Sequence, residues 1–550
     1  MRLIEPSERS FDEIRERFRW NVPARYNIGV DVCDRHAGIG DRTALHFENV
    51  QGVEQTFTFA ELKRLSDRFA NALAGLGIRR GDRVGIILPQ RIETAVAHIA
   101  VYKLGAVALP LSVLFGSDAL AFRLADSGAR ALVTDASRRD LIESIRPDLD
   151  DLQHVVPCDG EAGGFWDLIG AAGDAFTPAD TGADDPALLI YTSGTTGPPK
   201  GALNAHRCLL GNLPGFELSH NFFPHESDLM WSPADWAWTG GLLDALVPAL
   251  RYGVPVLGYD GGKFDPERSF ALIGKYRVRN AFIPPTALKL MMQVPDATAR
   301  YEVSMRSIMS AGEQVGAEVF HWADEALGVK INEMWGQTET NYLVGNCSAI
   351  MDVRPGSMGR PYPGHDVGVI DDAGNPLDDG TVGELAPRRG DPVMFLGYWG
   401  REDATREKFS GDWFRTGDLG YRDSDGYYWY MGRKDDVISS AGHRIGPGEI
   451  EDCLLKHPAV RQVAVVGAPD ALRGQRVKAF IVLAPGHTGS EALVEDIQQS
   501  VRTRLAAHEY PREVEFIDEL PLTTTGKVRR IELREWEIER ARGSVAGDGT

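Results

Sequence analysis

The sequence predicts an α/β protein. We expect a large N-terminal domain, made of two α/β subdomains and a small β-rich region, followed by a small α+β C-terminal lid domain. Three observations predict this class: strand-like and helix-like segments alternate from Thr58 onward, the alternation resumes near Met230, and the composition changes at residues 432–436. At ~150 residues per domain, a chain of 550 residues has room for about three to four globular units.

The first run of elements begins with a helix. Thr58 and Glu61 form a capping-box signature, in which each side chain bonds the backbone N–H of the other residue. Apolar residues then recur at helical spacing until Gly77. After Gly77 we expect strands at 83–88, 106–109 and 131–134 and helices at 92–102 and 119–124. This order is typical of a mostly parallel sheet covered by helices on both faces.

The remaining elements continue this pattern and then depart from it. The second run predicts strands at 254–257, 280–283, 307–310 and 330–334, separated by helical segments. Between about 359 and 430, short β-like segments and turns such as 371–375 and 425–426 indicate a small antiparallel region. The last part predicts helices at 449–455 and 493–505 and strands at 463–466 and 478–483. We place the domain boundary after residue 433, which gives domains 1–433 and 434–550.

Charge and cysteine content exclude several classes of function. The 59 basic and 79 acidic residues give a net charge of −20, which disfavours broad binding to nucleic acid or anionic lipid. The five cysteines are far apart in sequence, so we expect buried free thiols in a reducing compartment rather than a zinc or redox pair. The first residues lack an apolar signal core, and no apolar stretch reaches ~18 residues. We therefore expect a cytoplasmic protein with no membrane span.

A loop rich in glycine and hydroxyl groups follows a predicted strand at 187–190. Residues 191–201 read YTSGTTGPPKG, so three glycines free the backbone to curl around a concave space lined by N–H and O–H donors, with Lys200 near its end. Phosphate oxygens require such donors. Gly201 follows Lys200 where a Walker A loop has Ser or Thr, so this is a different kind of phosphate loop. The predicted phosphate ligands are Thr192, Ser193, Gly194, Thr195, Thr196, Gly197 and Lys200.

Four more motifs follow in order along the chain. They are Trp335-Gly336-Gln337-Thr338-Glu339-Thr340, the string WFRTGD at 413–418, GRKDD at 432–436 and PLTTTGK at 521–527. With the phosphate loop, these motifs resemble those of the AMP-forming adenylating superfamily, which includes acyl-CoA synthetases, peptide-synthetase adenylation domains and luciferases. The resemblance covers roughly residues 43 to 537. It implies that ATP activates a carboxylic acid as an acyl-adenylate with release of pyrophosphate, and that the CoA thiol then takes the acyl group and releases AMP.

The resemblance also implies roles for individual residues. Lys527, Glu339 and Thr338 would be catalytic: Lys527 stabilises the charge that builds at the α-phosphate, Thr338 donates to that phosphate, and the Glu339 carboxylate binds Mg²⁺. Asp418 would accept the ribose hydroxyls. The other nucleotide-binding residues implied are Gly312, Glu313, Gln314, Glu333, Met334, Trp335, Gly336, Gln337, Arg433 and Arg444.

A mobile lid follows from the two half-reactions. Adenylation needs Lys527 near the phosphate, whereas thioester formation needs it withdrawn and a channel for the CoA arm. In this family the lid rotates about a hinge aspartate, which corresponds to Asp435 here. The rotation would bring Ser440, Ala441 and Gly442 to the CoA channel.

The acyl pocket is predicted to be wider than acetate requires. Acetate-using members of the family carry a second tryptophan where this chain has Gly336. Other expected pocket positions after Trp238 are also small: Thr239, Gly240 and Ala311. Each buried methylene contributes ~0.8 kcal/mol, so we expect a medium-chain, branched or aromatic acid and offer Gly336→Trp as a test. Trp236 and Trp238 can narrow the site again, and core packing is an equal alternative for Trp238.

The acyl acceptor is predicted with less detail. CoA is favoured, and a separate carrier protein is the alternative. A nucleotide-binding scaffold without catalysis is disfavoured because Glu339 and Lys527 are both present. Acetylation of Lys527 by a lysine acetyltransferase, reversed by a deacetylase, would remove the needed charge and so is a candidate control. The sequence leaves the acid, the pathway and the oligomeric state open, a homodimer included.

Overall fold

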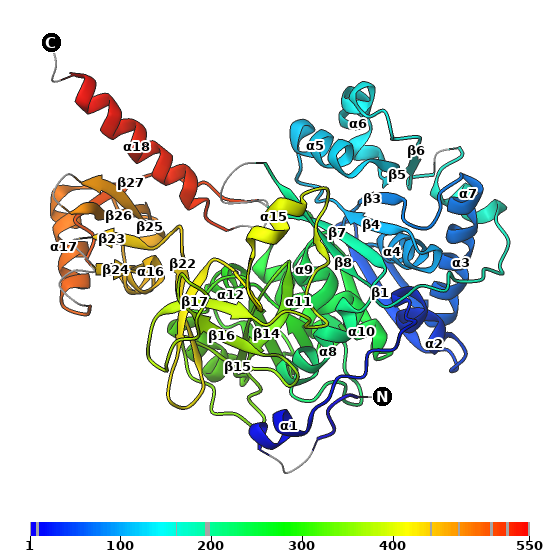
Figure 1. Cartoon of the computed structure of the whole chain (residues 1–550), viewed down its shortest axis with the longest axis horizontal. Helices are drawn as coiled ribbons and strands as arrows, with labels where there is room; N and C mark the ends of the chain where they lie inside the picture. Colours follow the sequence, from blue (N-terminus) through cyan, green and yellow to red (C-terminus); the bar gives the residue numbers. More distant parts are fainter. Residues whose placement is uncertain are drawn as a thin grey trace. The chain divides into compact units, whose positions relative to one another are not determined.

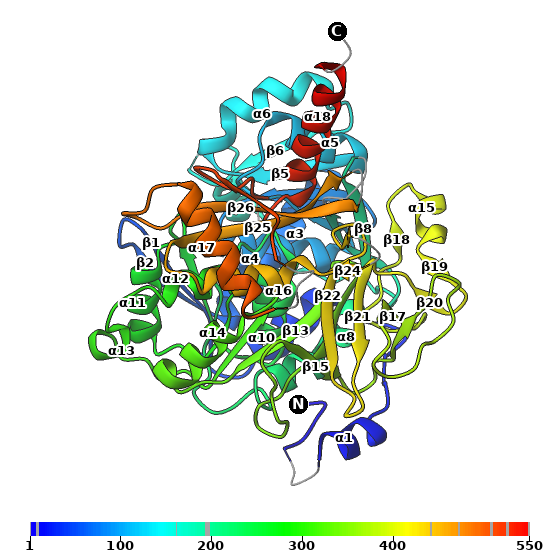
Figure 2. The same cartoon turned by 90° about the vertical axis from the view of Figure 1, so that its left-hand side faces the viewer.

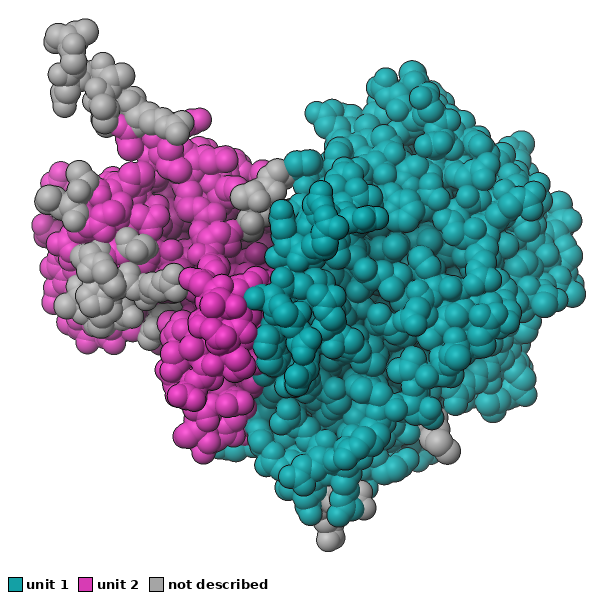
Figure 3. Space-filling model, in the orientation of Figure 1, with its two compact units in different colours: residues 1–367, 387–414 teal, residues 368–386, 415–550 magenta. Residues whose placement is uncertain are grey.

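The computed structural model describes residues 2–6, 10–160, 162–192, 198–440, 443–470, 473–505, 510–523 and 527–547. The chain forms two compact units, shown in Figure 3: unit 1 comprises 1–367 and 387–414, and unit 2 comprises 368–386 and 415–550. Five predicted phosphate ligands, Ser193 to Gly197, and the channel residues Ala441 and Gly442 lie outside the described residues. This division by compactness does not test the proposed boundary after residue 433, which stays a prediction.

Unit 1 contains a seven-stranded sheet in the order β18-β8-β7-β4-β3-β5-β6. Its strands from β7 to β6 are parallel to their neighbours, while β8 and β18 are antiparallel. The strands are β3 (Arg83–Ile87), β4 (Val107–Pro110), β5 (Ala129–Thr134), β6 (His154–Pro157), β7 (Pro186–Thr192), β8 (Lys200–Ala205) and β18 (Gly397–Tyr398). The predicted parallel sheet is confirmed.

Helices cover both faces of this sheet. In Figures 1 and 2, α3 (Phe59–Gly75) and α4 (Ile92–Leu104) lie on one face, and α5 (Ser117–Ser127) and α6 (Arg139–Ile145) lie on the other. Side chains of β7 alternate accordingly: Leu188 and Ile190 enter the core with α3 and α4, while Leu189 enters the core with α5 and α6. This period of two is what a strand buried on both faces requires.

The capping box predicted at the start of α3 is confirmed. The Thr58 hydroxyl accepts from the Glu61 N–H at 3.2 Å, and the Glu61 carboxylate accepts from the Thr58 N–H at 2.8 Å. The other helical segments of this part are α1 (Phe11–Arg17), η1 (Val30–Asp34), α2 (Arg35–Ala37), η2 (Ala136–Arg138), η3 (Arg146–Asp148) and α7 (Phe165–Ala171).

The second sheet of unit 1 runs in the order β15-β14-β13-β12-β11-β9-β10-β1-β2. From β13 to β1 neighbouring strands are parallel, so their carboxyl ends share one edge. The strands are β1 (Thr43–Asn49), β2 (Glu54–Thr58), β9 (Met230–Trp231), β10 (Val256–Asp260), β11 (Asn280–Phe282), β12 (Ser307–Ala311), β13 (Ile331–Gln337), β14 (Thr340–Gly345) and β15 (Ser357–Pro361). In open α/β sheets ligands bind at the carboxyl ends of the strands, so this edge is where a site is expected.

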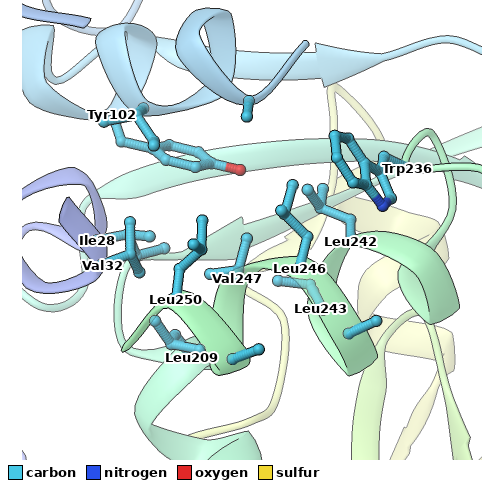
Figure 4. Close-up of a cluster of buried hydrophobic side chains, with 14 of the residues drawn as sticks. Ile28, Val32, Tyr102, Leu209, Trp236, Leu242, Leu243, Leu246, Val247 and Leu250 are labelled. Carbon is cyan, nitrogen blue, oxygen red and sulfur yellow. The ribbon is translucent and has the colours of Figure 1, made fainter. Parts of the chain in front are cut away.

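The apolar stretch near residue 245 is a buried helical segment. It is formed by α9 (Thr239–Gly241), η4 (Leu242–Leu246) and α10 (Val247–Arg251). Figure 4 shows leucines of this segment in one cluster with Tyr102 of α4 and Leu209 of α8 (Cys208–Ser219). Among the described helices, none is long and apolar enough to cross a membrane. The remaining elements of unit 1 are α11 (Pro266–Tyr276), α12 (Pro285–Met291), α13 (Ala297–Arg300), α14 (Ala317–Trp322), η5 (Ala323–Leu327), α15 (Glu402–Glu407), β19 (Phe409–Ser410) and β20 (Trp413–Phe414).

Unit 2 begins with the predicted antiparallel region. Its strands are β16 (Val367–Ile370), β17 (Gly383–Pro387), β21 (Asp418–Arg422) and β22 (Tyr428–Arg433), in that order across the sheet. Asp371 closes the first predicted turn, since its N–H donates to the Asn375 carbonyl at 2.9 Å. The Asp423 N–H donates to the Tyr427 carbonyl at 2.9 Å around the second. Both predicted turns are confirmed.

The rest of unit 2 is a second α/β assembly. Its five-stranded sheet has the order β24-β23-β26-β25, with β27 paired to β26. The strands are β23 (Ile438–Ser440), β24 (His443–Ile445), β25 (Val460–Asp470), β26 (Gly474–Leu483) and β27 (Glu513–Phe516), and the helices are α16 (Pro447–Leu455), α17 (Glu491–Arg502) and α18 (Arg530–Gly547). The helices and strands predicted in this part are all present.

The five cysteines should be inert in the native protein. All are free and buried, as predicted, and burial raises the pKa of Cys33, Cys208 and Cys347 to about 12. Because the thiolate is the reactive form, we expect no labelling by dithiobis(nitrobenzoate) at pH 8 until guanidinium unfolds the chain, when all five thiols should react. Rapid labelling of the native protein, followed by absorbance, would contradict this expectation.

Candidate active site

The two ends of the phosphate loop are held together by a strand pair. Thr192 ends β7, Lys200 begins β8, and the two residues are register partners. The Thr192 hydroxyl also donates to the Lys200 carbonyl at 3.3 Å. Thr192 and Lys200, the described residues at the two ends of the predicted phosphate loop, therefore lie side by side.

Thr338 and Glu339 form the turn of the hairpin between β13 and β14, which Gln337 and Thr340 close as register partners. Glu339 is only 8% exposed. Its carboxylate accepts from the Tyr398 hydroxyl at 2.6 Å, and its carbonyl accepts from the Phe395 N–H at 2.8 Å. A carboxylate in such a tight, bonded turn has a fixed position.

Tyr398 links this turn to Lys200, the residue at the end of the predicted phosphate loop. The ammonium of Lys200 lies 5.5 Å from the centroid of the Tyr398 ring, whose hydroxyl bonds Glu339. Tyr398 belongs to β18, which pairs with β8 next to the lysine. The structure thus brings two predicted phosphate-site residues, Lys200 and Glu339, to either side of one tyrosine. Sequence reasoning missed Tyr398 because it lies in none of the five motifs.

The two segments predicted to hold adenine lie side by side. Ala311 of β12 and Met334 of β13 are register partners. Gly312 follows with a φ of 96°, a backbone conformation that glycine adopts without strain. The Glu313 carboxylate accepts from the Thr286 hydroxyl at 2.8 Å, and the Glu333 carboxylate accepts from the Val315 N–H at 3.3 Å. Gln314 lies in the same loop, while Met334 and Trp335 are buried.

Three of the predicted acyl-pocket positions meet at the carboxyl edge of the second sheet. Ala311 and Gly336 lie at the ends of neighbouring strands, and Gly240 of α9 faces Phe282 at the end of β11. A Cβ on Gly240 would stand 2.2 Å from Cε1 of Phe282. The space that this glycine leaves is therefore filled by the phenyl ring. Phe282 was missed because nothing in the sequence connects it to Gly240.

Gly336 is constrained by backbone rather than by open space. It lies at a bulge between Trp335 and Gln337, and a Cβ there would stand 2.8 Å from the Tyr342 nitrogen and 3.0 Å from the Thr340 carbonyl oxygen. Any side chain would force β14 to move. The substitution Gly336→Trp would disturb this hairpin as well as the pocket, so it is not a clean test of pocket size.

The two tryptophans near residue 237 have different surroundings. Trp236 belongs to the main core, as Figure 4 shows, and is 1% exposed. Trp238 is half-buried, and its ring contacts Phe115 edge-on with centroids 5.9 Å apart. Thr239, next in sequence, begins α9. Trp236 is thus a core residue, while a pocket role for Trp238 and Thr239 stays a prediction.

Asp418, the predicted ribose-binding aspartate, lies in unit 2 and forms an ion pair with an arginine. Asp418 is buried at the start of β21, and Arg433, its register partner, donates to its carboxylate at 3.1 Å. Burial acts to lower the pKa of Arg433, but Asp418 and Asp435 outweigh it, so the pKa is raised. Gly417, with a φ of 79°, turns the chain so that its N–H donates to Glu384 at 2.9 Å.

The predicted hinge residue Asp435 and the predicted catalytic Lys527 also belong to unit 2. The Asp435 carboxylate lies 3.4 Å from Nε of Arg433. Ser440 ends β23 and is buried, whereas the side chain of Arg444 lies outside what the structure describes. Lys527 is exposed, and its loop is closed where its carbonyl accepts from the Thr523 N–H at 2.7 Å.

Two families of known proteins match most of the chain. The AMP-binding enzyme family matches residues 34–399, and the C-terminal domain of AMP-binding enzymes matches residues 449–527. This chain is an AMP-binding enzyme. It is 36% identical to acetyl-coenzyme A synthetase of Bacillus subtilis (98% of this chain, 97% of that one) and 33% identical to the mitochondrial acyl-coenzyme A synthetase ACSM3 of Mus musculus (96% and 93%). Its structure superposes on anthranilate CoA ligase AuaEII in complex with anthranoyl-AMP, with a TM-score of 0.86, 32% identity and coverage of 94% and 98%.

These matches confirm the resemblance and its main consequence. The AMP-binding enzyme is an acid–thiol ligase, an AMP-forming acyl-CoA synthetase that uses ATP and CoA. Its mixed α/β fold, with a large N-terminal and a smaller C-terminal part, is confirmed as well.

The donor set of this enzyme suits a metal held mainly by its substrate. Within the described ranges, no group of three or more His, Cys, Asp or Glu side chains could hold an ion. Glu339 offers one carboxylate whose position is fixed by its bond from Tyr398. Mg²⁺ in nucleotide enzymes typically binds one or two carboxylates together with substrate phosphates, so the residues present fit it.

Proposed function

We propose that this ligase activates a medium-chain, branched or aromatic carboxylic acid in preference to acetate and passes the acyl group to CoA. The observation that best supports an adenylation site is that Lys200 and Glu339 lie on either side of Tyr398. The domains would be 1–433 and 434–550, with the hinge at Asp435. The experiment is a panel of acids supplied with ATP and CoA, with AMP, pyrophosphate and thioester as readouts. Acetate as the best substrate would contradict the proposed specificity.

The proposed roles follow from the chemistry of the two steps. In the first, a carboxylate oxygen attacks the α-phosphorus and pyrophosphate leaves; in the second, the thiol attacks the acyl carbonyl and AMP leaves. Mg²⁺ would supply positive charge to the phosphates when bound at Glu339. Thr338 would donate to the α-phosphate, Asp418 would accept from the ribose hydroxyls, and Lys527 would stabilise the charge formed at phosphorus. Adenine would lie between the segments that contain Gly312 and Trp335.

Gly336 and Phe282 are the pocket residues of this chain that indicate the size of the acid. The family resemblance implies a second tryptophan in acetate-using members at the position of Gly336, and the lack of that side chain here supports a larger acid. The relatives do not decide between acetate and a larger acid, because an acetyl-coenzyme A synthetase and an anthranilate CoA ligase are both among them. Phe282, which fills the space beside Gly240, would then limit the length or width of the acid that the pocket accepts.

Replacing Phe282 with alanine should shift the preference toward longer acids. The shortened side chain would let about two further methylenes be buried, at ~0.8 kcal/mol each, so the kcat/KM ratio of octanoate to butyrate should rise about tenfold. Removing a buried phenyl group also destabilises the fold by about 3–5 kcal/mol.

A matched variant separates the two effects. Phe270 is equally buried and stacks on Tyr301 rather than facing Gly240. Phe270→Ala should lower the melting temperature by a similar amount and leave the octanoate-to-butyrate ratio unchanged. An unchanged octanoate-to-butyrate ratio in Phe282→Ala, or an equal change of this ratio in both variants, would show that Phe282 does not line the pocket.

A separate carrier protein is the alternative acceptor that remains to be tested beside CoA. Release of AMP and pyrophosphate without thioester in the panel would favour the carrier protein. The exposure of Lys527 gives an acetyltransferase access to its amine, which supports acetylation as a control of the first step. Recovery of activity after deacetylase treatment is the corresponding measurement.

A further inference from the structure

Two arginines connect the helix after the lysine loop to the hinge. Helix α18 begins at Arg530, three residues after Lys527, and Arg534 lies one turn further on the same face. Arg534 donates to the backbone carbonyl of Asp435 at 2.8 Å and also bonds the Asp436 carboxylate. The hinge segment 435–436 is therefore bonded directly to the helix that carries the lysine loop.

Arg530 reinforces this connection from the same helix. Its guanidinium makes a two-point contact with Glu451 of α16, at 2.6 and 3.2 Å, and lies 3.9 Å from the Asp436 carboxylate. Burial acts to lower the pKa of Arg530, but Glu451 and Asp436 outweigh it and raise the pKa. A two-point guanidinium–carboxylate contact fixes orientation as well as distance. Helix α18 is thus oriented relative to both α16 and the hinge.

Other contacts also hold α18 in the C-terminal assembly. Further along α18, Glu537 bonds the buried Lys478 of β26 at 2.8 Å, and Arg540 bonds Glu515 of β27 at 2.5 Å. These contacts already hold α18 against the sheet. The contacts of Arg530 and Arg534 are made instead to the hinge and to the helix beside it.

We propose that Arg530 and Arg534 are positioning residues for Lys527. By joining residues 435–436 to α18, which begins three residues after Lys527, they make the hinge end and this helix one rigid body, so that a rotation at Asp435 moves Lys527 by a defined amount. On the other side, Arg433 approaches the Asp435 carboxylate at 3.4 Å, so the hinge residue is held by its carbonyl and by its carboxylate separately. This inference rests on the proposed function, because it concerns delivery of Lys527 to the adenylation step.

The test measures the two half-reactions in full-length variants. Arg534→Met and Arg530→Met should lower the single-turnover rate of adenylate formation by ~10–100-fold, the range expected when a catalytic group is misplaced by about 1 Å. The KM for ATP should stay within about twofold, and thioester formation from supplied acyl-adenylate should be unchanged, because Lys527 is withdrawn in that step. Arg534→Lys, which keeps a donor for the Asp435 carbonyl, should recover part of the rate.

Two further variants keep the test decisive. Asp436→Asn removes the ion pairs that Arg534 and Arg530 make with the hinge, with little change in side-chain volume. It should show the same selective loss of adenylate formation. Arg540→Met removes contacts of the same helix to Glu515 and Glu537, so it should lower the melting temperature but spare both half-reactions. An unchanged adenylation rate in Arg534→Met, or an equal loss in Arg540→Met, would overturn the positioning role alone. A wild-type enzyme that forms no acyl-adenylate with any acid would overturn the proposed function itself.

Discussion

Replacing Lys527 with alanine should lower the rate of acyl-adenylate formation by ~10²–10³, the usual effect of removing one transition-state donor. Thioester formation from supplied acyl-adenylate should be largely spared, because the AMP leaving group is already in place. Lys527 is exposed, and its loop is closed by backbone and Thr523 contacts that alanine keeps, so the fold should be unaffected. Pyrophosphate release and thioester absorbance measure the two steps separately.

A neighbouring cation provides the control for Lys527. Arg529 is also exposed and pairs with Glu532 at 2.8 Å within α18 and the turn before it. Arg529→Ala removes one positive charge two residues away and should change neither step by more than about twofold, as expected for a surface ion pair. Equal losses of both half-reactions in Lys527→Ala would contradict the proposed role, because that pattern belongs to a binding or folding defect.

Local patterns in the sequence were sufficient for the elements of the fold. The reciprocal bonds of Thr58 and Glu61 involve residues three apart, so the chain itself specifies where α3 begins. Continuous burial of β7 on both faces follows from a run of apolar residues between turn signals, and the two turns after Asp371 and Asp423 depend on residues within four positions. Each of these features is decided by neighbours in sequence, which is why sequence reasoning could reach them.

Contacts between segments that are far apart in the sequence could not be predicted from it. Tyr398 approaches Lys200 and Glu339 because β18 pairs with β8, and Phe282 is a candidate pocket residue because α9 places Gly240 against its ring. Neither residue lies in a recognisable motif. The interpretation of Gly336 shows the same limit: its small size predicted an open pocket, whereas the structure adds a close approach to the backbone of β14. A glycine in a sequence indicates that a side chain is missing, and only the fold tells what takes its space.

Replacing Glu339 with glutamine should lower adenylate formation by ~10²-fold or more. The substitution keeps the shape of the side chain and its bond from Tyr398 but removes the negative charge, and a metal's stabilisation of transferring phosphate is worth several kcal/mol. If Glu339 binds Mg²⁺, the variant should also need a higher Mg²⁺ concentration to reach its half-maximal rate. Pyrophosphate release across a Mg²⁺ titration measures both effects.

Tyr398→Phe distinguishes the charge of Glu339 from its position. This variant removes the 2.6 Å hydrogen bond and leaves the carboxylate, and a hydrogen bond to a charged group contributes about 1.5–3 kcal/mol, so the loss should be about tenfold and at most about a hundredfold. Its Mg²⁺ dependence should resemble that of the wild type, because the charged ligand remains. If instead Tyr398→Phe shifts the Mg²⁺ requirement while Glu339→Gln does not, then the tyrosine and Lys200, rather than the carboxylate, organise the phosphates, and the metal must be held by the nucleotide without help from Glu339.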